Sequence, residues 1–179
     1  MSVAHKYLPH YTYEDYCQWE GNWEVIDGIP YAMSPSPVPL HQLVNMNLGA
    51  TFVNALKKGC EKCKVYMPID WKLTEDTIVQ PDLLIVCKEI QKKFLDFPPV
   101  LVVEIISPSS AFNDRNLKKE IYLSQKVKYY LIIDPQNQKT EVWQFSEGNY
   151  ISVPVMPSDF TFTLEDDCTA EVNLADIWE

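Results

Sequence analysis

Two carboxylates accompany short apolar runs that we expect to be β-strands. One lies inside its run, and the other lies at the start of its run. Glu104 lies inside Leu-Val-Val-Glu-Ile-Ile, and Asp82 follows Pro81 and leads into Leu-Leu-Ile-Val. An ionised carboxylate in a buried strand is costly unless it is paired with a cation or bound to a metal, and Glu is seldom buried without such a partner. If the two strands pair, both carboxylates can converge on one hard cation such as Mg²⁺ or Mn²⁺.

A cationic side chain follows on the next expected helix. Asp114, Lys118 and Tyr122 recur at i+4 spacing and therefore share one helix face. The ammonium of Lys118 is a candidate catalytic cation that would face a phosphate or the attacking water. Arg115 and Lys119 lie one turn apart from each other, and we expect both to be exposed.

Each of these three residues also has a purely structural interpretation. Glu104 could form a strand-end salt bridge with a Lys of a neighbouring element. Asp82 could cap a backbone amide in a turn. Lys118 could form a solvated pair with Asp114, worth about 0.3–0.5 kcal/mol. The combination of two acids in adjacent apolar strands with a Lys on the following helix favours a functional site.

The elements that must position these residues follow a mixed α/β order. The run 100–106 is apolar and β-branched except for Glu104, which is typical of a strand buried on both faces. With a helix at 113–125 and a strand at 129–133, it predicts a right-handed parallel crossover. The other expected elements are helices at 12–18 and 40–58 and from Asn173, a hairpin at 23–33 around Asp27-Gly28, strands at 64–68, 70–73 and 83–86, and a hairpin at 140–153.

The length of 179 residues fits one compact domain spanning 1–179. We expect a single central mixed β-sheet flanked by helices.

The net charge of −10 argues against simple charge-driven binding of nucleic acid. The charge is uneven, because no Lys or Arg follows Lys139 and residues 51–146 are close to neutral, so an anionic substrate would have to meet the middle of the chain. Arg115 is the single Arg, which argues against sequence-specific reading of guanines.

The five cysteines are an odd number, and no secretory signal pattern is visible. Free thiols in a reducing compartment are therefore expected. Cys60-x-x-Cys63 has the spacing of half a zinc site, but no second ligand pair is close in the sequence. No stretch approaches the roughly 20 apolar residues that cross a bilayer, so we expect a cytoplasmic protein without a membrane partner.

Several short motifs follow one another in a fixed order over residues 13–145. They are Glu24-Val-Ile-Asp-Gly28, Met33-Ser-Pro35, His41, Pro81-Asp82, Val103-Glu-Ile-Ile-Ser-Pro108, Asp114-Arg-x-x-Lys118-x-x-x-Tyr122, and Tyr130 to Asp134-Pro135. This ordered set resembles the Uma2 (DUF820) family of the PD-(D/E)XK nuclease-like superfamily.

The resemblance implies a restriction-endonuclease-like α/β core with a divalent metal site. Its metal ligands would be Asp82, Glu104 and the backbone carbonyl of Ile105. The usual Lys two residues after the Glu is absent, because that position is Ile106. The family pattern moves this Lys to the following helix, which matches Lys118.

The resemblance also implies roles for residues outside this centre. Glu24 would be an outer ligand of the metal or a water, although it could simply be exposed in its hairpin. His41 matches a position that is commonly His, although it could be a hydrogen-bonded core or cap residue. With Ser107, Arg115 and Tyr122, His41 completes the set of residues that would line the site or contact substrate.

The function that the resemblance implies is a Mg²⁺- or Mn²⁺-dependent endonuclease acting on nucleic acid, with DNA favoured over RNA. A homodimer is consistent with this function, because cleavage of a duplex often needs two sites. Two alternatives stay open. One is a catalytically silent binding or assembly module on a nuclease-like scaffold, which the acidic charge fits. The other is a metal-dependent hydrolase of a small phosphorylated molecule.

Overall fold

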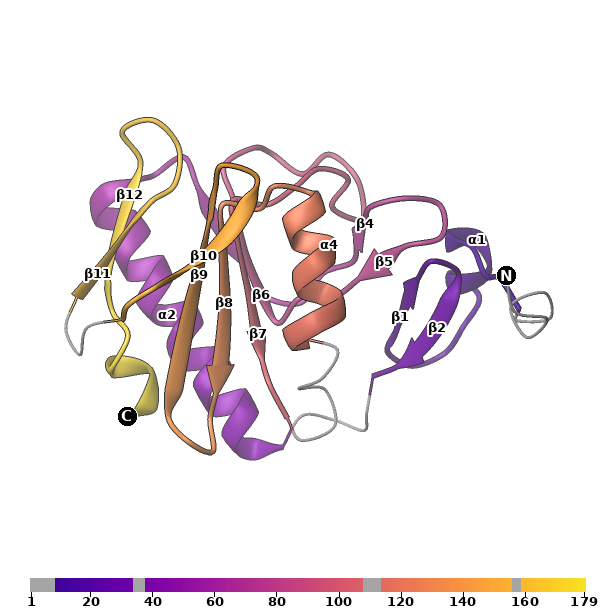
Figure 1. Ribbon diagram of the computed structural model, residues 1–179, viewed down its shortest axis with the longest axis horizontal. Coiled ribbons are helices and arrows are strands. Elements are labelled where there is room, and N and C mark those ends of the chain that lie inside the picture. Colours follow the sequence, from indigo (N-terminus) through magenta and orange to yellow (C-terminus); the bar gives the residue numbers. More distant parts are fainter. Residues whose placement is uncertain (1–8, 34–37, 108–113, 156–158) are drawn as a thin grey trace. The chain divides into compact units, whose positions relative to one another are not determined.

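A computed structural model describes residues 9–33, 38–107, 114–155 and 159–179 (Figure 1). The described residues form two compact units, which are treated separately below. The first unit comprises 9–33, 69–80 and 90–97, and the second unit comprises the remaining described residues. Within this described part of the chain, no helix has the length and apolar character needed to cross a membrane.

The first unit is a small antiparallel sheet. Its strands run in the order β2 (Ile29–Ala32), β1 (Trp23–Ile26), β5 (Ile78–Val79) and β4 (Trp71–Lys72). The expected hairpin at 23–33 is confirmed, and both of its turn residues, Asp27 and Gly28, have positive φ, as a tight two-residue turn requires. Helix α1 (Tyr13–Tyr16) begins at Thr12, whose backbone N–H and hydroxyl both donate to the Asp15 carboxylate.

The second unit is built on a six-stranded mixed sheet. Its strands run in the order β10 (Asn149–Val153), β9 (Lys139–Ser146), β8 (Tyr129–Asp134), β7 (Leu101–Ile105), β6 (Leu83–Val86) and β3 (Lys64–Tyr66). Only the β7–β8 pair is parallel, and the chain between these strands carries helix α4 (Lys119–Ser124). The expected mixed central sheet and its parallel strand–helix–strand unit are therefore confirmed.

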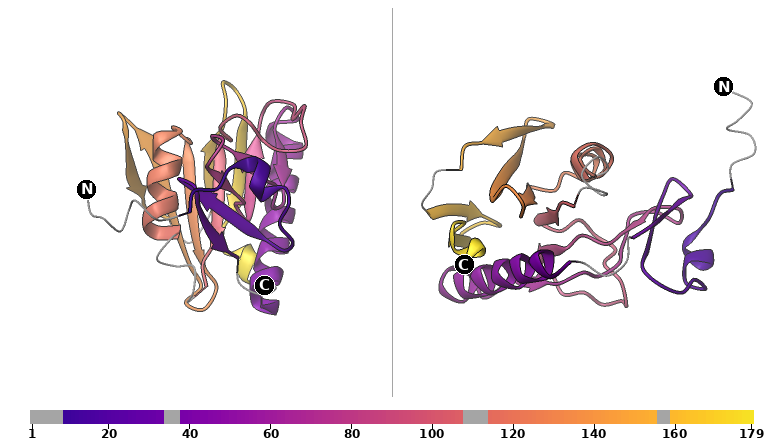
Figure 2. Two further views of the ribbon diagram at one scale, coloured as in Figure 1. Left: turned by 90° about the vertical axis from the view of Figure 1, so that its right-hand side faces the viewer. Right: turned by 90° about the horizontal axis from the view of Figure 1, so that it is seen from below.

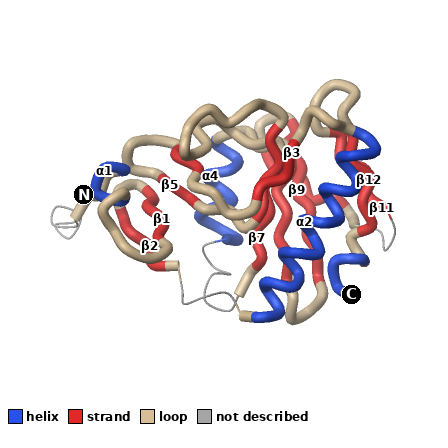
Figure 3. Tube along the Cα trace, turned by 180° about the vertical axis from the view of Figure 1, so that it is seen from behind, coloured by secondary structure: helices blue, strands red, loops and turns tan. Residues whose placement is uncertain are grey.

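Side chains alternate between the two faces of this sheet, and each face meets a different helix. Leu83, Val103 and Leu131 are cross-strand neighbours in the main hydrophobic core, which also takes the apolar stripe of α2 (Pro39–Gly59). On the other face, the rings of Tyr122 in α4 and Tyr130 in β8 meet edge to face, with centroids 5.1 Å apart. Figures 1 and 3 show α4 and α2 on opposite sides of the sheet. The sheet is thus a middle layer that both helices bury.

The segment before α4 differs from the sequence prediction of one regular helix over 113–125. Residue 113 lies outside the described residues, and Asp114–Lys118 form a π-helical turn, named η2, that leads into α4. A π-helical turn is wider than an α-helical turn and is common at functional sites. The i+4 pattern at 114–122 therefore identified the helical segment but not its winding.

The C-terminal part forms a hairpin that the sequence prediction missed. Strands β11 (Asp159–Thr163) and β12 (Thr169–Asn173) pair with each other and not with the central sheet (Figure 2). Phe162 lies against both Phe52 of α2 and Tyr129 of β8, with ring centroids 5.5 and 5.1 Å apart. The helix expected from Asn173 is only a 3-10 turn, η3 (Asp176–Trp178), because Asn173 still belongs to β12.

Replacing Phe52 by Ala tests this packing. Phe52 is fully buried, so the change should lower the free energy of unfolding by about 3–5 kcal/mol through lost burial and a cavity. Urea denaturation followed by circular dichroism measures the effect. The neighbouring Val53 is 38 % exposed, and Val53→Ala should change stability by less than about 1 kcal/mol. Equal effects of the two substitutions would contradict the described packing of α2.

Candidate active site

The register of the central sheet places the two predicted acidic residues at the same end of neighbouring strands. Strands β6 and β7 are antiparallel, with Leu83 opposite Val103. Asp82 immediately precedes β6, so continuation of this register places Asp82 across from Glu104. Residues directly opposite each other in such a pair have Cβ atoms about 4.5–5.5 Å apart. The condition set by the sequence, that the two acid-bearing strands must pair, is met.

Asp82 is held by both the neighbouring strand and helix α2. Its Oδ2 atom accepts a hydrogen bond of 2.7 Å from the backbone N–H of Ile105, the residue after Glu104. Its Oδ1 atom lies 3.3 Å from Nε2 of His41, and its carbonyl oxygen accepts a hydrogen bond of 3.1 Å from Nδ2 of Asn45. His41 and Asn45 are one helical turn apart, so the start of α2 fixes Asp82 through two side chains.

Glu104 is almost completely buried, at 2 % exposure, and is held by two donors from the crossover. The ammonium of Lys118 lies 3.1 Å from its Oε1 atom, and the hydroxyl of Tyr122 donates to the same oxygen at 2.5 Å. Lys118 is itself only 4 % exposed. The structural interpretation of Glu104 as the partner of a Lys therefore holds, and that Lys is the one the sequence singled out for chemistry. The alternative interpretation, in which Lys118 forms a solvated pair with Asp114, is wrong, because Lys118 is buried.

Arg115 and Lys119 are half-buried, and the expectation that both are exposed is wrong. Arg115 Nη1 lies 2.7 Å from Oε1 of Glu141 in β9, and Lys119 Nζ lies over the ring of Trp143 in the same strand. Burial lowers the pKa of Lys119, although the nearby Glu141 carboxylate opposes this effect. Both cations therefore face β9, which the expectation of exposure did not anticipate.

Glu141 was not singled out from the sequence, yet it lies in the same cross-strand row as Glu104. Glu104 pairs with Ile132, and Ile132 pairs with Glu141. Burial of Glu141 acts to raise its pKa, but hydrogen bonds and charges of Arg115 and Lys139 outweigh this effect and lower the pKa. Glu141 is therefore kept ionised by Arg115 and Lys139.

Two other predicted site residues have different surroundings. Glu24 lies in β1 of the first unit, is 6 % exposed, and accepts a hydrogen bond of 2.8 Å from the backbone N–H of Gln80. The interpretation of Glu24 as an exposed hairpin residue is therefore wrong. Ser107 is half-buried two residues after β7. The side chain of Asp114 lies outside the described residues.

The donor types at Asp82 and Glu104 fit a hard divalent cation. Two carboxylates and the Ile105 carbonyl are the oxygen ligands that Mg²⁺ and Mn²⁺ prefer, with waters or phosphate oxygens completing the shell. Within the described residues, the only group of three or more His, Cys, Asp or Glu side chains whose ligand atoms lie together consists of cysteines. A cation at Asp82 and Glu104 would therefore depend on the backbone carbonyl and on substrate or water oxygens.

Residues 12–175 match the Uma2 family, which is described as "Putative restriction endonuclease". The chain belongs to the Uma2 family. This Uma2 chain is 28 % identical over 161 residues to the protein named "Uncharacterized protein slr1290" of Synechocystis, a match that covers 85 % of this chain and 84 % of the relative.

A solved structure from Anabaena variabilis, described as a putative nuclease belonging to DUF820, shares the fold of this Uma2 chain. The TM-score is 0.74 at 15 % identity, and the match covers 93 % of this chain and 97 % of the other. The expected restriction-endonuclease-like α/β fold and the family resemblance are both confirmed by these comparisons.

The buried Glu104–Lys118 pair can be tested through stability. Lys118→Met leaves the Glu104 carboxylate without its cation and should cost about 3–5 kcal/mol of unfolding free energy. Adding Glu104→Gln to Lys118→Met removes the charge altogether and should restore most of that loss. Urea denaturation of the two single variants, the double variant and the unchanged protein gives the coupling energy. A loss in the double variant equal to the sum of the two single losses would show that the two charges are not coupled.

The Arg115–Glu141 pair makes a prediction about pH. The folded-state pKa of Glu141 is lowered, so the pair contributes stability above the unfolded pKa of a Glu and loses it as pH falls through the lower folded pKa. Arg115→Met should therefore reduce stability at pH 7 by about 0.5–1 kcal/mol, a value typical of a partly exposed pair. The difference between the variant and the unchanged protein should disappear in strong acid. A difference that is constant across the pH range would exclude this electrostatic cause.

Proposed function

We propose that this Uma2 chain is a nuclease that hydrolyses phosphodiester bonds of nucleic acid, with Asp82, Glu104 and the Ile105 carbonyl as ligands of Mg²⁺ or Mn²⁺ and Lys118 as the catalytic cation. The observation that carries this proposal is the end of the β6–β7 pair, where Asp82 accepts a hydrogen bond from the Ile105 N–H and Lys118 contacts Glu104. The family description and the description of the Anabaena structure support the same class of activity.

The chain's own residues would divide the work of positioning and charge compensation. Lys118 and Tyr122 both contact Oε1 of Glu104, so together they fix the orientation of this carboxylate. The Ile105 N–H and His41 hold the two oxygens of Asp82 in the same way. Preorganised ligands need no rearrangement when the cation and the phosphate arrive, which lowers the cost of reaching the transition state.

Lys118 would serve in place of the Lys that the superfamily carries two residues after the Glu. That position is Ile106, which is buried and carries no charge. The ammonium of Lys118 is the cation that the structure provides at Glu104, and it would stabilise negative charge that develops on the phosphate. When bound, the divalent ion would lower the pKa of a coordinated water and polarise the phosphate.

Calorimetric titration of Mn²⁺ into the purified protein tests the proposed ligands without any assumption about the substrate. We expect saturable binding that disappears in Glu104→Gln and in Asp82→Ala. Because Glu104→Gln leaves a buried ammonium without its partner, the double variant Glu104→Gln/Lys118→Met provides a charge-free reference. The exposed Glu171 of β12 is the matched control, and Glu171→Gln should bind Mn²⁺ normally.

Cleavage assays on duplex DNA, single-stranded DNA and RNA then test the reaction itself. Lys118→Met should keep Mn²⁺ binding but reduce turnover by at least about 100-fold, because it removes charge stabilisation in the transition state. Mn²⁺ binding without cleavage of any polymer would favour either a metal-binding module or a hydrolase of small phosphorylated molecules. Assays with nucleotide substrates distinguish these two functions. Absence of Mn²⁺ binding both with and without added DNA contradicts the proposed metal site.

A further inference from the structure

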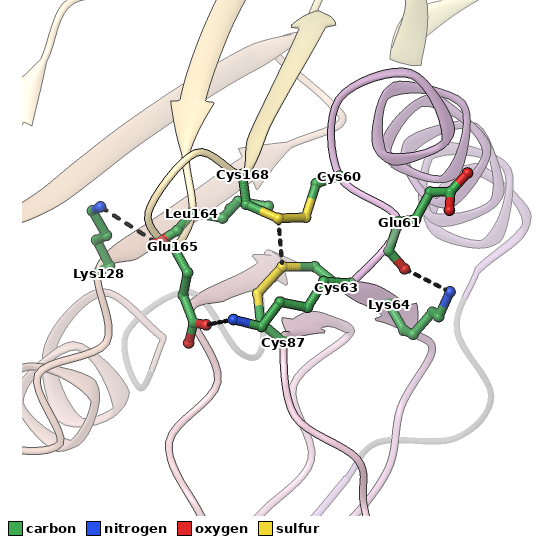
Figure 4. The surroundings of a disulfide bond; sticks show 10 residues. Cys60, Glu61, Cys63, Lys64, Cys87, Lys128, Leu164, Glu165 and Cys168 are labelled. Carbon is green, nitrogen blue, oxygen red and sulfur yellow. Dashed lines mark hydrogen bonds and ion pairs between the residues drawn. A yellow bond between two sulfur atoms is a disulfide. The ribbon is translucent and has the colours of Figure 1, made fainter.

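Four of the five cysteines come together in the second unit, although they are far apart in the sequence. Cys60 follows α2, Cys63 precedes β3, Cys87 follows β6, and Cys168 precedes β12. The structure joins them as two disulfides, Cys60–Cys168 and Cys63–Cys87 (Figure 4). Cys17 is exposed and free. The expectation of five separate free thiols is therefore wrong. Cys60 and Cys63 thus have a second cysteine pair beside them in space, although none is close in the sequence.

The backbone places these sulfurs together, independently of the bonds between them. Strands β3 and β6 pair with Lys64 opposite Val86, so the next pair outward in the same register is Cys63 and Cys87. Gly59, at the end of α2, lies so close to β12 that an added Cβ would stand 2.4 Å from the carbonyl oxygen of Thr169. This close approach carries Cys60 to Cys168, whose Cα atoms are 4.8 Å apart.

Three of the four sulfurs lie close to one another, and the fourth, that of Cys87, is bonded to Cys63. The Sγ atoms of Cys63 and Cys168 lie 3.8 Å apart, and the Sγ atoms of Cys60, Cys63 and Cys168 all lie within 4.8 Å of one another. Tetrahedral zinc with Zn–S bonds of about 2.3 Å requires sulfurs about 3.8 Å apart. Cys60-x-x-Cys63 also has the ligand spacing that is common in structural zinc sites.

Most of the cysteine cluster is shielded from water. Cys60, Cys63 and Cys87 are each less than 8 % exposed, so a bound ion would be shielded from water. Lys64 and Lys128 donate to the carbonyl oxygens of Glu61 and Leu164 beside the cysteines (Figure 4).

We propose that Cys60, Cys63, Cys87 and Cys168, when reduced, form a closed tetrathiolate site for one structural Zn²⁺ ion. Four protein ligands leave no open position, so the ion would stabilise the fold and take no part in hydrolysis. It would tie the end of α2, the β3–β6 edge and the β11–β12 hairpin to one point. The site is separate from the carboxylates, because Asp82 precedes β6 and Cys87 follows it. Thiolates also select zinc, whereas oxygen ligands select Mg²⁺ or Mn²⁺.

The oxidised and zinc-bound forms would be two states of the same four sulfurs. Two molecules of a phosphine reductant, which take up the oxygen of two waters, convert the two disulfides into four thiols. Binding of Zn²⁺ then forms four Zn–S bonds and releases the four thiol protons. The Zn²⁺ ion itself is neither oxidised nor reduced.

The test is metal analysis of the full chain after phosphine reduction and exposure to Zn²⁺, followed by gel filtration. We expect about one zinc per chain, because the four cysteines form a single closed site. We also expect a higher melting temperature than for the reduced metal-free protein. Co²⁺ in place of Zn²⁺ should give the intense visible and charge-transfer absorption of tetrahedral cobalt thiolate. This spectrum needs no variant, so it remains decisive even where a Cys substitution disturbs folding.

Matched variants locate the site. Cys87→Ser should lose the zinc or bind it at least about 10-fold more weakly, since one of four ligands is removed. Cys17→Ser, which changes the exposed fifth cysteine, should keep one zinc per chain, and so should Glu104→Gln. No zinc in the reduced unchanged protein, or a cobalt spectrum without thiolate bands, would overturn the proposal. Unaltered zinc content and cobalt spectrum in Cys87→Ser would overturn the four-cysteine assignment.

Discussion

The antiparallel pairing of β6 with β7 is the constraint on which the candidate site depends. One register, with Leu83 opposite Val103, decides that Asp82 meets Glu104 and that Ile105 donates to Asp82. A slip of one residue would turn every side chain of β6 to the other face of the sheet. The apolar residues of β6 and β7 are fully buried on both faces, so such a slip would place core residues against the wrong helix. The packing that stabilises the sheet therefore also fixes the position of the proposed site at the end of these two strands.

The sequence could single out Glu104 and Lys118, which the structure pairs, because each carried a local contradiction. Glu104 is a charge in an apolar strand, and Lys118 recurs with Tyr122 on one helical segment, so the structure could satisfy both only by pairing them. Asn45 and Glu141 carried no such contradiction. Asn45 is an ordinary polar residue of a long helix, and only its spacing of four from His41 could have indicated a shared partner.

The fold was predictable where hydrophobic periodicity is strong. It was less predictable where elements are short or where contacts between residues far apart in the sequence determine the structure. The central strands and α2 follow from their apolar patterns, whereas β5 has only two residues, and π-helical winding has no signal in the periodicity. The β11–β12 hairpin alternates buried and exposed residues around Phe162 and Val172, so its pattern was readable. The cysteine cluster could not be read from the sequence, because contacts across more than a hundred residues bring it together.

The position of the β11–β12 hairpin has a consequence for the order of events during synthesis. Phe162 covers Phe52 of α2, and the chain between Cys60 and Cys168 has a sequence separation of 108. A ribosome adds roughly 5–20 residues per second, so α2 would exist for seconds before its covering hairpin emerges. During that interval the apolar stripe of α2 can be buried only by the sheet or by a chaperone. Long-range closure of this kind makes folding slow and makes the growing chain depend on protection from aggregation.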